Sequence, residues 1–274
     1  MGLIKGPIGV FDSGFGGLEI LRHIVKKLPQ YDYIYLGDTA RTPYGSRSQE
    51  VIYNFTKQAV AFLFKQKCPL VILACNTASC EALRKIQQRY LKNHYPQRRV
   101  LGVVIPASEA AKETTKNNRV GVIGTEGTIN SMAFEREIKK INPKIKVFAQ
   151  ACPLLVPIVE SGEHNTPIAQ LALQKYLQPL LAKQIDTLIL GCTHYGFLEK
   201  QIKKIVGQKI KIIIEGRVVA EKLADYLQRH QEIEKSIAQN QKRKFFTTDL
   251  TDKFQKLGSY FFGEPINPQK INLE

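Results

Sequence analysis

Short apolar runs alternate with longer amphipathic segments along most of this 274-residue chain. A continuously apolar run is typical of a strand buried on both faces of a parallel sheet, and the segments between the runs have helical spacing. This alternation predicts an α/β fold. Predicted helices include residues 18–28 and 59–64, and the predicted strands are residues 8–11, 33–36, 70–74, 100–104, 120–123, 145–148, 187–190, 210–214 and 245–247.

Two breaks divide this pattern. The basic stretch 89–99 separates the first group of strands from the next, and a weaker break falls near 207–209. The length fits about two domains at roughly 150 residues each. The apolar content of 43% is enough for a sizeable core and excludes an intrinsically disordered chain.

The chain carries no sequence signal for a membrane. Its longest obvious apolar run, residues 69–75, is much shorter than the roughly 18 residues that span a bilayer. The amino terminus lacks the apolar core and cleavage site of a signal peptide. We therefore expect a cytoplasmic protein that does not interact with membranes.

The net charge is high, because 40 basic and 24 acidic residues give +16. Such a surplus can indicate binding to nucleic acid or to an anionic membrane surface. Here the basic residues are scattered through amphipathic segments such as 22–28 and 135–140. This distribution favours a solvated basic surface that keeps the protein soluble.

The five cysteines are an odd number in a long chain without secretory signals, so a disulfide framework is not expected. None of them has the Cys or His spacing of a zinc or iron–sulfur site, and no metal is expected. Reactive thiols and buried small hydrophobic residues remain as alternatives. The five are Cys68, Cys75, Cys80, Cys152 and Cys192.

Two of these cysteines occur in similar surroundings. Segments 71–77 and 188–194 share an apolar strand, a small residue, a cysteine and a hydroxyl residue that enters a predicted helix. Ligands of parallel α/β sheets bind at the carboxyl ends of strands, and a helix amino terminus there can lower a thiol pKa. If Cys75 and Cys192 face one cavity, one thiol can remove a proton from a carbon while the other delivers a proton to its opposite face. That reaction inverts a stereocentre without a cofactor.

Candidate acid–base partners lie beside both cysteines. Asp12 ends the first predicted strand and could assist a thiol, although an N-cap in a glycine turn explains it equally well. His194 lies two residues after Cys192, and Glu160 is a weaker candidate. The glycines after Asp12 do not form a dinucleotide fingerprint, because Glu19 occupies the third glycine position.

Small hydrogen-bond donors suggest a pocket for carboxylates. A turn at residues 43–45 adds backbone N–H groups and a phenol to the side-chain donors. Hydroxyls, amides and helix amino termini can hold carboxylates without an arginine, although each residue could also be an ordinary cap or turn residue. The candidates are Ser13, Pro43, Tyr44, Gly45, Asn76, Thr77, Thr125, Thr128 and Thr193.

Taken together, six segments resemble the glutamate racemase family, bacterial enzymes that make D-glutamate for peptidoglycan and so serve cell-wall biogenesis and cell shape. They are Phe-Asp-Ser-Gly-Phe-Gly-Gly-Leu, Pro-Tyr-Gly, Ala-Cys-Asn-Thr-Ala-Ser, Gly-Thr-Glu-Gly-Thr-Ile, Val-Pro-Ile-Val-Glu and Gly-Cys-Thr-His-Tyr, at residues 11–18, 43–45, 74–79, 124–129, 156–160 and 191–195. The resemblance implies two similar three-layer α/β domains with mainly parallel sheets and the active site in the cleft between them. Residues 1–98 with 211–274 would form one domain, and residues 99–210 the other.

The resemblance also implies a homodimer, glutamate as the substrate, and a two-thiol mechanism without cofactor. By motif position, Cys75 would act on D-glutamate with help from Asp12, and Cys192 on L-glutamate with help from His194 and Glu160. The substrate-holding pairs would be Asp12–Ser13, Tyr44–Gly45, Asn76–Thr77 and Thr193–His194. The chain departs from the family at Glu215, where an Asp is common.

Three other functions remain open from the sequence. The nearest is racemisation of aspartate or another amino acid within the same superfamily. A cysteine hydrolase would use one thiol with His194 and a carboxylate. A regulator that binds DNA or DNA gyrase would use the basic surface, with steeply salt-dependent DNA binding.

Overall fold

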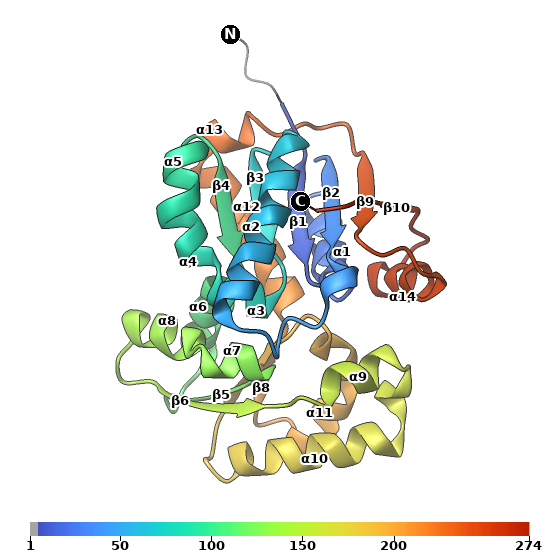
Figure 1. The fold of residues 1–274 in the computed structure, drawn as a ribbon. Coiled ribbons are helices and arrows are strands. Elements are labelled where there is room, and N and C mark those ends of the chain that lie inside the picture. Colours follow the sequence, from blue (N-terminus) through green and yellow to red (C-terminus); the bar gives the residue numbers. More distant parts are fainter. Residues whose placement is uncertain (1–4, 274) are drawn as a thin grey trace.

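Two fully parallel sheets form the framework of the protein in a computed structural model that describes residues 5–273 (Figure 1). The six-stranded sheet has the order β10 (Pro268–Lys270), β9 (Arg243–Thr247), β2 (Tyr33–Gly37), β1 (Ile8–Asp12), β3 (Leu70–Leu73) and β4 (Arg99–Gly102). The four-stranded sheet has the order β6 (Lys146–Ala151), β5 (Arg119–Gly124), β7 (Thr187–Gly191) and β8 (Lys211–Ile213). The predicted α/β class is confirmed, and each of the predicted strands is present.

Helices cover both faces of each sheet. The α-helices are α1 (Gly17–Lys27), α2 (Gln49–Lys65), α3 (Asn76–Glu81), α4 (Leu83–Lys85), α5 (Lys92–His94), α6 (Val104–Thr114), α7 (Glu126–Asn130), α8 (Ala133–Ile141), α9 (Leu155–Glu160), α10 (Pro167–Leu181), α11 (Glu199–Val206), α12 (Glu215–Arg229), α13 (Gln231–Glu234) and α14 (Asp252–Phe262). A π-helical turn, η2 (Ile86–Leu91), joins α4 to α5, and the 3-10 helices are η1 (Thr39–Arg41), η3 (Glu163–Asn165) and η4 (Tyr195–Leu198).

Alternation along β1 separates the two cores of the larger sheet, because successive side chains of a strand point to opposite faces. Ile8 and Val10 pack with α1, α12 and α14. Phe11 packs on the other face with α2, α3 and α4. The smaller sheet is built alike, with α6 and α8 on one face and α9, α10 and α11 on the other.

The pairing of the edge strands differs by a few residues from the division of the chain that the sequence suggests. β4 pairs with β3 in the larger sheet, although residue 99 was expected to open the second domain. β8 pairs with β7 in the smaller sheet, although residue 211 was expected to return to the first. The carboxyl-terminal strands β9 and β10 lie in the larger sheet beside β2. We therefore propose that the chain crosses between domains after β4 and again after β8.

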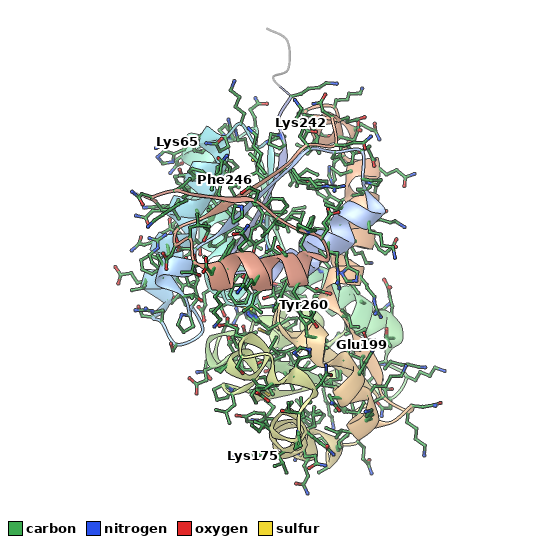
Figure 2. All side chains as sticks on the ribbon, turned by 90° about the vertical axis from the view of Figure 1, so that its right-hand side faces the viewer. Lys65, Lys175, Glu199, Lys242, Phe246 and Tyr260 are labelled. Atoms are coloured by element: carbon green, nitrogen blue, oxygen red, sulfur yellow. The ribbon has the colours of Figure 1, made fainter. Side chains whose placement is uncertain are left out.

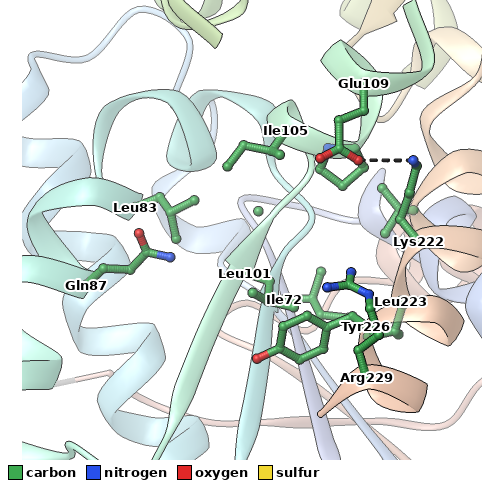
Figure 3. Close-up of a pocket in the computed structure, with 13 residues that line it drawn as sticks. Ile72, Leu83, Gln87, Leu101, Ile105, Glu109, Lys222, Leu223, Tyr226 and Arg229 are labelled. Atoms are coloured by element: carbon green, nitrogen blue, oxygen red, sulfur yellow. Dashed lines mark ion pairs between the residues drawn. The ribbon is translucent and has the colours of Figure 1, made fainter. Parts of the chain in front are cut away.

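The two crossing segments meet at one place. Helix α6, which follows β4, packs against α12, which follows β8. Figure 3 shows this junction, where a cavity of about 150 Å³ is lined by both helices and by β4. Lys222 of α12 pairs there with Glu109 of α6 at 3.1 Å.

The six-stranded sheet with its helices is called the larger half here, and the four-stranded sheet with its helices the smaller half. Helix α14 connects these two halves. Thr251 caps its amino terminus by accepting a hydrogen bond from the Phe254 N–H group, and Gly263 ends it with a φ of +91° that favours glycine. Phe261 stacks on Phe197 of η4 with 4.1 Å between ring centroids. Figure 2 shows Tyr260 where α14 meets the smaller half. Within residues 5–273, no helix has the length and apolarity to cross a membrane.

Candidate active site

The two expected reactive cysteines each follow the carboxyl end of an inner strand, one in each sheet. Cys75 follows β3 and forms the N-cap position of α3. Cys192 follows β7, and the loop after it leads into the 3-10 helix η4 rather than directly into an α-helix. The helix predicted directly after Cys192 is therefore a short 3-10 helix and not an α-helix.

Close contact between loops brings these strand ends together. Gly16, in the loop after β1, lies so near the Cys192 loop that a Cβ there would be 2.3 Å from Thr193 Oγ1. Negative charge on Cys75 would raise the pKa of Cys192. The structure thus brings both cysteines to one junction between the sheets.

On the Cys75 side, the sulfur contacts a hydroxyl and lies near a buried carboxyl. Cys75 Sγ is 3.4 Å from Ser13 Oγ. Asp12 is buried, and its Oδ2 accepts a hydrogen bond of 2.9 Å from the Gly14 N–H group. Burial raises the pKa of Asp12, although His194 and backbone N–H groups oppose the shift. Asp12 Oδ1 is buried and has no partner within residues 5–273.

On the Cys192 side, a chain of polar contacts leads from the sulfur toward solvent. Cys192 Sγ lies 3.8 Å from His194 Nδ1, and His194 Nε2 lies 3.2 Å from Glu160 Oε1. Lys253 of the α14 amino terminus lies 3.6 Å from Glu160 Oε2. Burial tends to raise the pKa of Glu160, but His194 and then Lys253 outweigh it and lower that pKa. The Phe15 ring makes an edge contact with His194, with 5.8 Å between ring centroids.

The expected lowering of the thiol pKa values is wrong for this structure. Burial, and next the charge of Asp12, raise the pKa of Cys75 to about 11. Burial raises the pKa of Cys192 as well, against a hydrogen bond from the His194 backbone. Desolvation therefore outweighs the helix amino terminus, which favours anions only modestly.

Three threonine hydroxyls connect the two halves beside Cys75. Thr77 Oγ1 of α3 lies 3.0 Å from Thr125 Oγ1, which caps α7 and lies 3.0 Å from Thr128 Oγ1. The Gly45 carbonyl accepts a hydrogen bond of 2.9 Å from the Gly127 N–H group. The expected donors Gly45, Thr77, Thr125 and Thr128 therefore lie together.

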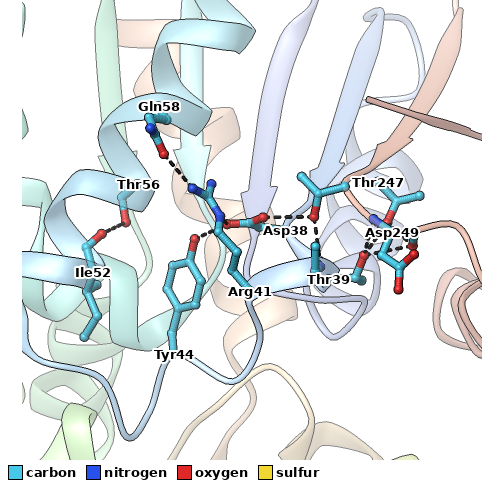
Figure 4. A network of polar contacts seen from close by, with 11 residues as sticks. Asp38, Thr39, Arg41, Tyr44, Ile52, Thr56, Gln58, Thr247 and Asp249 are labelled. Carbon is cyan, nitrogen blue, oxygen red and sulfur yellow. Dashed lines mark hydrogen bonds and ion pairs between the residues drawn. The ribbon is translucent and has the colours of Figure 1, made fainter. Parts of the chain in front are cut away.

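Tyr44 does not offer its phenol to this site, contrary to expectation. Its hydroxyl donates a hydrogen bond of 2.5 Å to Asp38 Oδ2, and its ring is buried (Figure 4). Asp38 is fully buried and also accepts hydrogen bonds from Arg41 Nε at 2.8 Å and Thr248 Oγ1 at 2.9 Å. Tyr44 thus anchors the Pro43–Gly45 loop through its contact with Asp38.

Both sulfurs are closed off from solvent. Cys75 is 5% exposed and Cys192 is 7% exposed. A cavity of about 450 Å³ lies beside the site, and its walls include Pro43, Gly45, Thr125 and Glu160 but neither cysteine. Binding of a ligand between the sulfurs would therefore require the loops around them to move.

The sequence reasoning missed Asp38 and left the role of Glu215 undefined. Asp38 follows β2 directly, and Glu215 begins α12 one residue after β8. Glu215 Oε2 accepts a hydrogen bond of 2.6 Å from Asn76 Nδ2. Both are polar residues after predicted strands, which is the signal that did identify Asp12.

Known proteins resemble this chain along nearly its whole length. The sequence model of the Asp/Glu/Hydantoin racemase family matches residues 8–223. The glutamate racemase of Geobacter metallireducens is 40% identical over 268 residues, which cover 97% of each chain.

Solved structures agree with this match. The glutamate racemase of Francisella tularensis, determined in complex with D-glutamate, is 35% identical with a TM-score of 0.89 and 98% coverage of both chains. Isoform RacE1 of the Bacillus anthracis glutamate racemase is 36% identical with a TM-score of 0.90 and the same coverage.

Fold and sequence therefore define an isomerase with the architecture of the Asp/Glu racemases. Within that class, the chain belongs to the glutamate racemase family.

Proposed function

We propose that the protein interconverts L-glutamate and D-glutamate without a cofactor, using Cys75 and Cys192 as the two acid–base groups. The observation that carries this proposal is the junction of two cysteines, each with its own polar partners, at the ends of β3 and β7. One thiolate takes the proton from Cα and becomes a thiol. The opposite thiol gives its proton to the other face of the carbanion and becomes a thiolate.

Cys75 acts on D-glutamate in this proposal. Ser13 contacts its sulfur, and Asp12 is the nearby carboxyl that assists proton transfer. The burial that raises the pKa of Asp12 lets its carboxyl group hold or release a proton closer to neutral pH than an exposed aspartate does.

Cys192 acts on L-glutamate in the proposal, with His194 as the adjacent base. The 3.2 Å contact with Glu160 orients the imidazole. Lys253 shares the Glu160 carboxylate and keeps it ionised. The two thiols thus have different acid–base partners: a carboxyl group assists Cys75, and an imidazole paired with a carboxylate assists Cys192.

Substrate binding supplies the charge that favours the thiolates. No lysine or arginine appears among the main groups that shift either thiol pKa in residues 5–273. The α-ammonium group of glutamate would bring a positive charge between the sulfurs, which favours the anionic form of each. The thiols then become reactive only with the amino acid present.

The polar residues around the thiols would hold the two carboxylates. Thr77, Thr125 and Thr128 form the connected hydroxyl group beside Cys75. Asp12 and Ser13 contribute from the end of β1, and Asn76, Thr193 and His194 contribute from the segments after the two cysteines. The loop of Pro43, Tyr44 and Gly45 contributes the backbone N–H groups of Tyr44 and Gly45.

In the cell, this activity would supply D-glutamate for peptidoglycan, and thus for cell-wall biogenesis and cell shape. We propose that the enzyme works in the cytoplasm as a homodimer, as the family resemblance implies. The D-glutamate complex of the Francisella tularensis relative supports glutamate as the substrate.

The decisive experiment follows D- and L-glutamate separately in deuterated water. Racemisation should place deuterium at Cα of the product from either direction, and aspartate should not be turned over. Cys75→Ser and Cys192→Ser should each abolish turnover, whereas Cys68→Ala, a buried cysteine elsewhere in the larger half, should retain it. Turnover of aspartate alone, or a requirement for only one thiol, would refute the proposal.

A further inference from the structure

Glu215 is a buried carboxyl group in direct contact with a residue beside Cys75. It begins α12, is 3% exposed, and lies at the point where the chain crosses from β8 toward the larger half. Its Oε2 atom lies 2.6 Å from Asn76 Nδ2, and Asn76 directly follows Cys75 at the start of α3. The contact therefore links a crossing helix to the Cys75 loop.

The charges around Glu215 oppose its ionisation. Within residues 5–273, no basic side chain pairs with it. From α1, Glu19 adds a second buried carboxyl, whose own partners are His23 at 3.2 Å and Arg22 at 3.9 Å. On α12, the nearest cation, Arg217, pairs instead with Glu199 at 3.0 Å.

The other titratable neighbours are thiols. Ionised Glu215 would raise the pKa of Cys192 and of Cys80 on α3. The Asn76 contact lowers the pKa of Glu215, but burial and then the charge of Glu19 outweigh it and hold that pKa well above its usual range. This shift favours the protonated carboxyl group.

A protonated Glu215 favours the opposite orientation of the Asn76 side-chain amide, with Oδ1 toward Glu215. With Nδ2 toward Glu215, both Asn76 Oδ1 and Glu215 Oε1 are buried without a partner. The oxygen and nitrogen of an amide are assigned from its hydrogen bonds, and 2.6 Å fits an O–H···O contact better than an N–H···O contact. Exchanging the two atoms lets Glu215 donate to Asn76 Oδ1.

We propose that Glu215 is a positioning residue whose carboxylic acid donates to Asn76 Oδ1 and thereby turns the Asn76 NH₂ group toward the substrate. The free NH₂ group then donates to a glutamate carboxylate beside Cys75. This inference rests on the proposed function, because it assigns Asn76 to substrate binding. A glutamine at position 215 can make the same contact, since its NH₂ group also donates to Asn76 Oδ1.

The test compares Glu215→Gln, Glu215→Leu and the control Glu221→Gln, which changes an exposed carboxylate on the same helix. Steady-state kinetics in both directions should give Glu215→Gln a KM within about threefold of the parent. Glu215→Leu should raise KM about tenfold or more, with a smaller change in kcat, because the lost contact orients a donor to a charged group. The control should match the parent.

Difference infrared spectra of the protein without substrate, parent minus Glu215→Gln, should show the C=O stretch of a carboxylic acid at neutral pH. The inference is overturned if this band is absent, if Glu215→Gln is as impaired as Glu215→Leu, or if folded Glu215→Leu binds glutamate normally. Thermal unfolding shows whether Glu215→Leu folds. For an unfolded Leu variant, the infrared band and the kinetics of Glu215→Gln test the inference. Failure of the parent to racemise glutamate would instead refute the proposed function, while the band would still report the state of Glu215.

Discussion

Asp38 is expected to be the residue on which the Pro43–Gly45 loop depends most strongly. Its buried carboxylate accepts hydrogen bonds from Arg41 Nε, the Tyr44 hydroxyl and the Thr248 hydroxyl, at 2.5 to 2.9 Å. Arg41 and Tyr44 come from the segment after β2 (Figure 4), and Thr248 comes from the far end of the chain. Asp38→Ala removes the acceptor of all three, leaves the buried Tyr44 hydroxyl without its partner, and leaves the Thr248 hydroxyl with only the Ala40 N–H group.

The size of the effect follows from these contacts. A hydrogen bond to a charged group contributes about 1.5–3 kcal/mol, so the three bonds set an upper range of roughly 4–9 kcal/mol. Arg41 keeps part of its side chain in solvent and regains hydration when Asp38 is lost. We therefore expect Asp38→Ala to lower the free energy of unfolding by about 3–5 kcal/mol, as for other broken buried pairs. Tyr44→Phe removes one bond and should cost about 1.5–3 kcal/mol.

The assay is chemical denaturation followed by circular dichroism, with the double variant included. Because both changes remove the same contact, the double variant should lose less than the sum of the two single effects. Asp225→Ala, which removes an exposed carboxylate, should leave the free energy of unfolding nearly unchanged. A loss below about 1 kcal/mol for Asp38→Ala, or strict additivity with Tyr44→Phe, would refute the reasoning.

Three further predictions follow from the junction. Gly16→Ala should lower kcat/KM by on the order of a hundredfold in steady-state kinetics, because its Cβ would displace Thr193 and His194; an unchanged value would contradict that close approach. Turnover of D-glutamate should increase with pH through the neutral range, because the raised pKa of Cys75, about 11, keeps this base protonated there; a flat pH profile would count against this. The free energy of unfolding should decrease as pH rises above 4.5, the ordinary pKa of Glu215, because the folded state there binds more protons than the unfolded state. Denaturation curves of Glu215→Gln should show a weaker dependence on pH. The same dependence in parent and variant would contradict a raised pKa of Glu215.

The strands could be predicted because each is a short apolar run with little ambiguity. Residues 187–190, for example, form the centre of β7. The sheet that each edge strand joins could not be predicted, because residues 100–104 and 210–214 are equally apolar and differ only in their neighbours in space. Strand β10 was missed because Pro268–Lys270 contains only exposed or polar positions after its proline.

The candidate site was predictable where strand ends carry distinctive side chains. Asp12, Cys75 and Cys192 each follow an apolar run, and the structure brings them to one junction. The pKa of each thiol was not predictable, because it depends on how completely the opposite half buries the sulfur. The partner of Tyr44 was equally hidden, since Asp38 becomes a buried acceptor only after Thr248, from the far end of the chain, packs beside it.

The most direct measurement of the central claim is a crystal structure of the protein with glutamate bound. The account predicts that the loops after β3 and β7 part enough to admit the amino acid and that Cys75 Sγ and Cys192 Sγ lie on opposite faces of its Cα, each within contact distance. Glutamate bound elsewhere, or with both sulfurs on one face of Cα, would contradict it.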